Sequence, residues 1–166
     1  MTDQDNVVDH FDLGNAAMSD NRYGVAVDEF REAVKINPAF AEAYNNLGLA
    51  LFYLSRFDDA VSEYRTALRI APDFALAHAN LGLALLNKDL VDEAIAELDS
   101  AISLNPELAE AYYNLGIAYN KKGLADEAVK AYEGFIQHAG ENYRNYVEGV
   151  QKIVSQMKSK AGKSDN

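Results

Sequence analysis

Hydrophobic residues recur along this chain in pairs of stretches that both have helical spacing. In one such pair the first stretch carries Tyr44, Leu47 and Leu51. The second stretch carries Ala60, Val61, Tyr64, Ala67 and Leu68. This i, i+3, i+4, i+7 pattern is typical of an amphipathic helix. The polar link SRFDD between the stretches is short, so the pattern predicts two antiparallel helices.

The pair is repeated at a fixed interval. Pro38, Pro72 and Pro106 stand 34 residues apart, and Gly48, Gly82 and Gly116 keep the same interval. A period of this length indicates one small structural unit stacked several times. It divides the chain into four units, residues 7–40, 41–74, 75–108 and 109–142, of which the first is the loosest copy.

The repeated residues resemble the tetratricopeptide repeat family. Its large and small packing positions are matched in the second unit by Tyr44, Leu47, Gly48, Leu51, Ala60, Tyr64, Ala67 and Pro72. The third unit matches them with His78, Leu81, Gly82, Leu85, Ala94, Leu98, Ala101 and Pro106. The resemblance covers residues 7–142. It implies an all-α fold, a right-handed superhelix of helix pairs whose first helices line the concave side.

The fourth unit departs from the pattern. Phe135 replaces a small alanine and Gly140 replaces the proline, which indicates packing against something other than another repeat. Residues 143–158 supply one apolar stripe, formed by Tyr143, Tyr146, Val147, Val150, Ile153, Val154 and Met157. We expect a capping helix, because a terminal repeat exposes a hydrophobic face. A membrane-surface or partner-binding helix is the alternative. Residues 1–6 and 159–166 are expected to be tails, the second flexible and basic.

Three asparagines stand in register, Asn46, Asn80 and Asn114, each directly before Leu-Gly. Asparagine is unfavourable inside a helix, so three equivalent ones need a reason. Each follows a packing residue by two positions, about 200° around the helix, and therefore points away from the packing stripe. Similar asparagines hold an extended polypeptide by its backbone in the tetratricopeptide superhelix of the O-linked N-acetylglucosamine transferase. That resemblance implies the same role here, with Asp12 at the matching position of the first unit. The alternative is that these amides bind the backbone of neighbouring repeats or water.

Helical spacing places further residues on the same face. They are Asn15, Glu42, Asn45, Leu49, Phe52, Tyr53, Leu76, Leu83, Asn87, Glu110, Tyr113, Ile117, Asn120 and Lys121. This lining is apolar and aromatic with acidic spots, so it suits an extended segment with apolar side chains and a basic residue. The same surface would also serve self-association. Co-chaperones of the family clamp a carboxylate with cations, but this chain has Phe11, Leu76 and Asn80 at those positions.

Composition narrows the function classes. The net charge is −11, divided into −14 for residues 1–142 and +3 for residues 143–166. An acidic body disfavours nucleic acid. A solvated helical surface is the first explanation of the charge, and attraction of a cationic partner is the alternative. The chain has no cysteine, no secretion signal and no apolar run of the ~20 residues that span a bilayer, so a cytoplasmic protein without membrane contact is expected.

The chain shows no catalytic pattern. Its three histidines are His10, His78 and His138, and the first two occupy equivalent packing positions. Neither a metal-binding spacing nor a phosphate-binding loop is present, so no enzyme activity, metal or cofactor is expected. The sequence therefore predicts a non-catalytic scaffold or adaptor that binds an extended polypeptide in its concave groove. A self-associating assembly protein, and hence a homo-oligomer, is the alternative. A regulatory piece of an enzyme complex is a second one.

Overall fold

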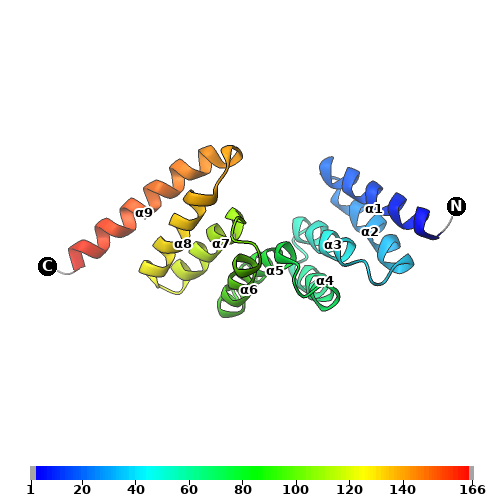
Figure 1. Cartoon of the computed structure of the whole chain (residues 1–166), viewed down its shortest axis with the longest axis horizontal. Helices are drawn as coiled ribbons and strands as arrows, with labels where there is room; N and C mark the ends of the chain where they lie inside the picture. Colours follow the sequence, from blue (N-terminus) through cyan, green and yellow to red (C-terminus); the bar gives the residue numbers. More distant parts are fainter. Residues whose placement is uncertain (1–2, 165–166) are drawn as a thin grey trace.

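The helices come in four antiparallel pairs followed by one long helix (Figure 1). The computed structural model describes the backbone of residues 3–164 and the side chains of residues 6–160. The helices are α1 (Asp3–Ser19), α2 (Tyr23–Ile36), α3 (Ala41–Tyr53), α4 (Phe57–Ile70), α5 (Ala75–Asn87), α6 (Val91–Leu104), α7 (Ala109–Lys121), α8 (Ala125–His138) and α9 (Arg144–Ser164), with a 3-10 turn η1 (Glu141–Tyr143) before α9. Residues 3–164 contain no strand, so the all-α superhelix expected from the sequence is confirmed.

Each pair of helices is held by a small residue that faces a large one. A Cβ added to Gly48 would lie 2.7 Å from the ring of Tyr64, and one added to Gly82 would lie 2.6 Å from Leu98. Both partners are buried, Tyr64 at 1% and Leu98 at 0% exposure. The glycines therefore let the two helices of a pair approach closely.

The turn inside each pair repeats as well. Asn21, Ser55, Asp89 and Gly123 all have positive φ, between 58° and 75°. In the second pair, the N–H of Arg56 donates to the carbonyl of Leu51 at 2.9 Å, closing the helix end with the long-range bond of a Schellman motif. Pro72 then ends α4, because Ala71 is already extended, with φ −128° and ψ 88°. Local sequence thus fixes both ends of this hairpin.

Second helices pack on the first helix of the next unit, so the buried residues form one continuous core from α1 to α8. A smaller cluster joins α7, α8 and α9. Phe135 belongs to this cluster and packs against Tyr143, with ring centroids 5.8 Å apart. The unusual residue of the fourth unit therefore contacts the terminal helix, as expected.

The terminal helix covers α8 with part of its apolar stripe. Val150 and Val154 are buried at 2% and 7% exposure, whereas Tyr146 and Ile153 remain 63% and 39% exposed. The stripe is thus wider than the surface it covers. One flank of α9 stays apolar and open.

Both expected tails are shorter than the sequence analysis proposed. Residues 3–6 already belong to α1 and residues 159–164 to α9, while residues 1–2 and 165–166 lie outside the described residues.

Candidate functional site

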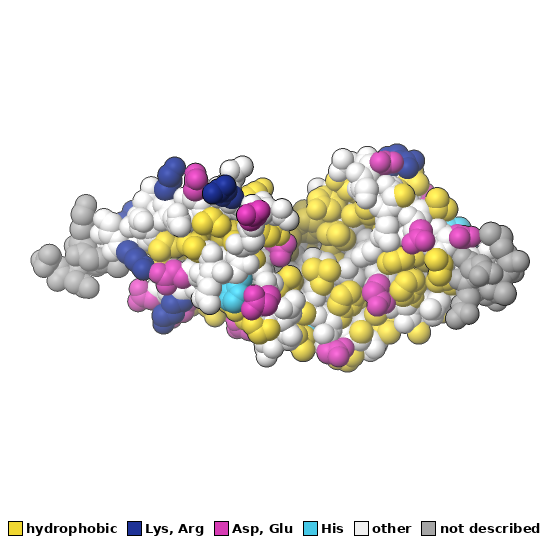
Figure 2. All heavy atoms as spheres, turned by 45° about the horizontal axis from the view of Figure 1, so that its top comes forward, with side chains coloured by type: hydrophobic (Ala, Val, Ile, Leu, Met, Phe, Trp, Pro, Cys, Tyr) yellow, Lys and Arg dark blue, Asp and Glu magenta, His cyan; other side chains and the backbone are white. Residues whose placement is uncertain are grey.

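The concave side of the superhelix carries a groove of about 380 Å³. Figure 2 shows hydrophobic side chains gathered along the hollow, with acidic residues scattered at its borders. The inner helices α3, α5 and α7 supply most of the lining, and Tyr143 of η1 and Tyr146 of α9 stand at one end. The superhelix therefore encloses an aromatic trough whose end is formed by the terminal helix.

Half of the residues expected on this face line the groove. They are Leu49, Phe52, Tyr53, Leu76, Asn80, Leu83, Glu110, Tyr113 and Asn114. Five further residues line it that the sequence analysis did not place there: Ala79, Leu108, Phe135, Tyr143 and Tyr146. A signal for three of them existed, since Phe135 broke the repeat pattern and the two tyrosines lay on the terminal stripe.

The remaining expected residues lie outside the groove lining. Asp12, Glu42, Asn87, Asn120 and Lys121 are exposed. Lys121 donates to Asp89 at 2.6 Å and Asn87 to the carbonyl of Leu83 at 2.9 Å. Ile117 is half-buried and packs against both hydrophobic clusters. Periodicity placed these residues on the inner helices, but it could not distinguish residues that line the groove from exposed residues beside it.

Four asparagine side chains form a continuous chain of hydrogen bonds across three units. Asn80 donates to Asn45 at 3.0 Å, Asn45 donates to Asn46 at 3.1 Å, and Asn46 donates to Asn15 at 2.9 Å. Asn45 is only 1% exposed. The amides of Asn46 and Asn80 therefore bind asparagine side chains of the preceding unit, and not the neighbouring backbone or water of the alternative reading.

The amide chain does not continue to the fourth unit. The α5 positions that correspond to Asn45 and Asn15 are Ala79 and Leu83, whose side chains accept no hydrogen bond. Asn114 is 8% exposed and lines the groove, and within the described residues its amide takes no part in the chain. In the described region, every fully buried side-chain N or O atom has a hydrogen-bond partner. The amide of Asn114 is therefore not a buried polar group that lacks a hydrogen bond. Asn114 therefore differs from Asn46 despite the identical register.

The groove has one carboxylate and no cationic side chain among its lining residues in the described region. Glu110 accepts a hydrogen bond from the hydroxyl of Tyr143. This bond, reinforced by burial, raises the pKa of Tyr143 to about 12. The rings of Tyr113 and Phe135 lie 5.3 Å apart beside them. The site is thus aromatic and weakly acidic, and the carboxylate clamp set aside from the sequence is not formed here.

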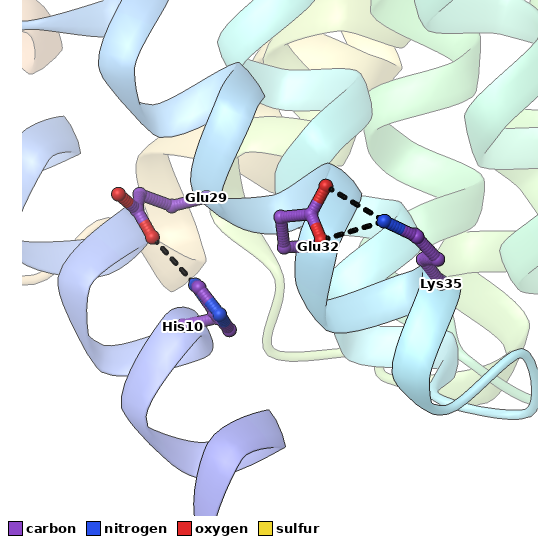
Figure 3. A network of polar contacts seen from close by, with 4 residues as sticks. All are labelled: His10, Glu29, Glu32 and Lys35. Carbon is purple, nitrogen blue, oxygen red and sulfur yellow. Dashed lines mark hydrogen bonds and ion pairs between the residues drawn. The ribbon is translucent and has the colours of Figure 1, made fainter.

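Histidines brace the helix pairs. His10 Nδ1 lies 2.7 Å from Oε2 of Glu29, which joins α1 to α2, while Glu32 and Lys35 form a separate pair along α2 (Figure 3). In the third unit His78 Nδ1 lies 2.6 Å from Glu97, and its Nε2 lies 2.9 Å from the carbonyl of Pro72. Within the described residues no three metal-ligating side chains converge. The half-buried packing role expected for these histidines agrees with their positions.

Comparison with known families identifies the repeat. The chain matches the profile of the tetratricopeptide repeat family at residues 11–73, 47–107 and 79–143. The chain therefore belongs to the tetratricopeptide repeat family. No curated protein matches it at a significant level. In the part of the chain that the structure describes, no helix is both long and apolar enough to cross a membrane.

Solved structures with the same superhelix include MamA, which is 31% identical over 80% of this chain and 78% of its own, with a TM-score of 0.75. YrrB, titled a TPR protein with an unusual peptide-binding site, is 21% identical over 88% of this chain and 74% of its own, with a TM-score of 0.74. The second TPR domain of human RPAP3, in complex with the HSP70 peptide SGPTIEEVD, is 18% identical over 70% of this chain and 98% of its own, with a TM-score of 0.68. The last two likenesses establish the fold alone.

Proposed function

We propose that this protein is a non-catalytic adaptor that binds an extended polypeptide segment in the groove of its inner helices. The carrying observation is the open aromatic trough that contains an amide, Asn114, left out of the hydrogen-bond chain between repeats. An amide offers one acceptor and two donors, which match both polar groups of a peptide bond. The similarity to peptide-binding members of the family supports this role.

The polar grip is asymmetric along the groove. Asn80 and Asn114 occupy equal positions of adjacent units, about 10 Å apart at ordinary helix spacing, which is roughly three extended residues. Asn80 already donates one N–H to Asn45, whereas Asn46 both donates and accepts within the chain of amides. Asn114 therefore makes the main hydrogen bonds to the partner's backbone, and Asn80 contributes fewer.

The lining defines the chemistry of the partner. Tyr53, Leu76 and Tyr146 are 53%, 46% and 63% exposed, so they offer apolar area to an incoming side chain. Glu110 favours a lysine or arginine next to that apolar residue, since it is the one charged residue of the described lining. An acidic peptide finds no cation there. The partner segment is thus apolar and basic.

Peptides selected from a random display library against the purified protein test this proposal. Asn114→Ala should weaken the selected peptides about 5- to 30-fold, since a lost peptide hydrogen bond is worth roughly 1–2 kcal/mol. Glu110→Gln should weaken those that contain lysine or arginine. Fluorescence anisotropy of labelled peptides measures both effects.

Matched variants separate the groove from the rest of the surface. Leu76→Asp removes apolar groove surface, whereas Leu104→Asp changes a leucine of nearly equal exposure, 45% against 46%, outside the lining. Peptide affinity should fall for the first and stay unchanged for the second. Neither of these two variants should bind the HSP70 peptide SGPTIEEVD. Equal affinity of the wild type and Leu76→Asp for the selected peptides would refute the proposal.

A further inference from the structure

The N-terminal end of the superhelix exposes a face that every later unit buries. Leu13 is 55% exposed, whereas its equivalents Leu47, Leu81 and Leu115 are 2%, 1% and 6% exposed. Ala16 is also exposed, although the three equivalent alanines are fully buried. The later residues are covered by the second helix of the preceding unit, whereas within the described residues α1 packs against α2 and α3 alone. The end face of α1 therefore has the shape of an inter-repeat surface without its partner.

The opposite end of the molecule also retains an uncovered apolar flank. In the described residues α9 packs against α8 and η1, with Val150 and Val154 in that contact. Ile153 lies beside this contact and is 39% exposed, and Lys160 lies on the same face two turns further on. Within the described residues, and unlike the inner helices, α9 is not followed by a second helix that pairs with it. Its outer flank is thus the other unfinished surface of the stack.

The two ends carry opposite charge. The sequence of α1 contains four aspartates and neither lysine nor arginine. That of α9 contains five lysines or arginines and one glutamate. On α1, Asp9 is exposed one turn from Leu13, and on α9, Lys152 and Lys160 are exposed near Ile153. Two α1 faces repel one another, as do two α9 faces, whereas α1 attracts α9.

We propose that a second copy of this chain docks its α1 end face on the outer flank of α9, with Leu13 and Ile153 at the centre of the contact. Figure 1 shows that α1 and α9 lie at opposite ends of the molecule, so one copy cannot make this contact with itself. The contact is heterologous and leaves one free end at each side, so association produces open linear chains.

Sedimentation velocity of the full chain at increasing concentration tests the proposal. The average mass should rise with protein concentration and fall with added salt, because salt screens the attraction between the ends. Leu13→Asp and Ile153→Asp should each keep the protein monomeric, since either one buries an unpaired charge in the contact. Leu124→Asp, at 38% exposure against 39% for Ile153, is the matched control and should associate like the wild type.

An equal mixture of the two variants identifies the geometry. Leu13→Asp retains an intact α9 flank and Ile153→Asp retains an intact α1 face, so the mixture should form dimers and nothing larger. A wild-type protein that stays monomeric at every concentration would overturn the proposal. Association of one single variant as strongly as the wild type would also overturn it, because it would show an α1-to-α1 or α9-to-α9 contact. Circular dichroism of each variant verifies that the fold is retained.

Discussion

At the scale of single residues, the fold depends on glycines at the positions where two helices of a pair meet. Gly48 lies against the ring of the buried Tyr64, while Gly149, in the middle of α9, has no atom within 4 Å of an added Cβ. The same chemical change at these two positions therefore has opposite consequences. In one case it forces two helices apart, and in the other it improves helix propensity without a new contact.

Gly48→Ala should lower the free energy of unfolding by about 1–3 kcal/mol, because the buried ring cannot move away from the added methyl group. Gly149→Ala should raise it by about 0.5–1 kcal/mol, the usual gain of alanine over glycine inside a helix. Urea denaturation followed by circular dichroism measures both. Changes of the same sign at the two sites would contradict this account of the repeated glycines.

Residue identity at equivalent positions also decides the state of each asparagine. Asn46 and Asn114 share the same register, yet one is bonded to Asn15 of the preceding unit and the other faces Ala79 and Leu83 at the corresponding positions. A helical pattern tells on which face of its helix a residue lies. A hydrogen bond also depends on which residue of the neighbouring unit lies opposite. The partners here lie 31 and 35 residues away, so the pattern around each asparagine did not reveal them.

At the scale of elements, the terminal helix closes the stack. Val154 is 7% exposed and packs in the cluster that joins α7, α8 and α9. Repeat proteins contact mainly their nearest neighbours, so a defect at this end should remain local. The same helix supplies Tyr146 to the groove, which links its docking to the shape of the candidate site.

Val154→Ala should cost about 1–2 kcal/mol of local stability, since it removes two buried methyl groups. Hydrogen exchange should show faster exchange in α8 and α9, with α3 to α6 unchanged. Ile153→Ala, on the exposed flank of the same helix, is the control and should change stability by less than about 0.5 kcal/mol. Faster exchange throughout the molecule after Val154→Ala would show that α9 is coupled to every repeat.

At the scale of the whole molecule, the core is one continuous layer of side chains between stacked pairs. Leu98 in α6 is fully buried and lies against Gly82 in the third unit, near the middle of this layer. A central repeat contacts neighbours on both sides. A defect there should therefore be felt in both halves of the chain, in contrast to one at the end.

Leu98→Ala should lower the free energy of unfolding by about 2–5 kcal/mol, the range for a buried leucine truncated to alanine. Hydrogen exchange should accelerate from α3 to α8 and not in α6 alone. Leu104→Ala, at the exposed end of the same helix, should leave both measurements nearly unchanged. A loss of protection confined to the third unit would mean that the units unfold independently.

The sequence by itself determined the number of hairpins, because helical spacing and one exact period define each of them. The superhelix followed from the resemblance of the repeated residues to the tetratricopeptide family. The same resemblance implied that the first helices line the concave side. The tertiary structure alone decided which residues on that face are available. It paired Asn45 and Asn46 with other units, left Asn114 in the trough, and brought Tyr143 and Tyr146 to the end of the groove through the turn after Gly140. These outcomes depend on which side chain a neighbouring unit presents at the contact. The repeat period gives the positions of the units but not the side chains that meet between them.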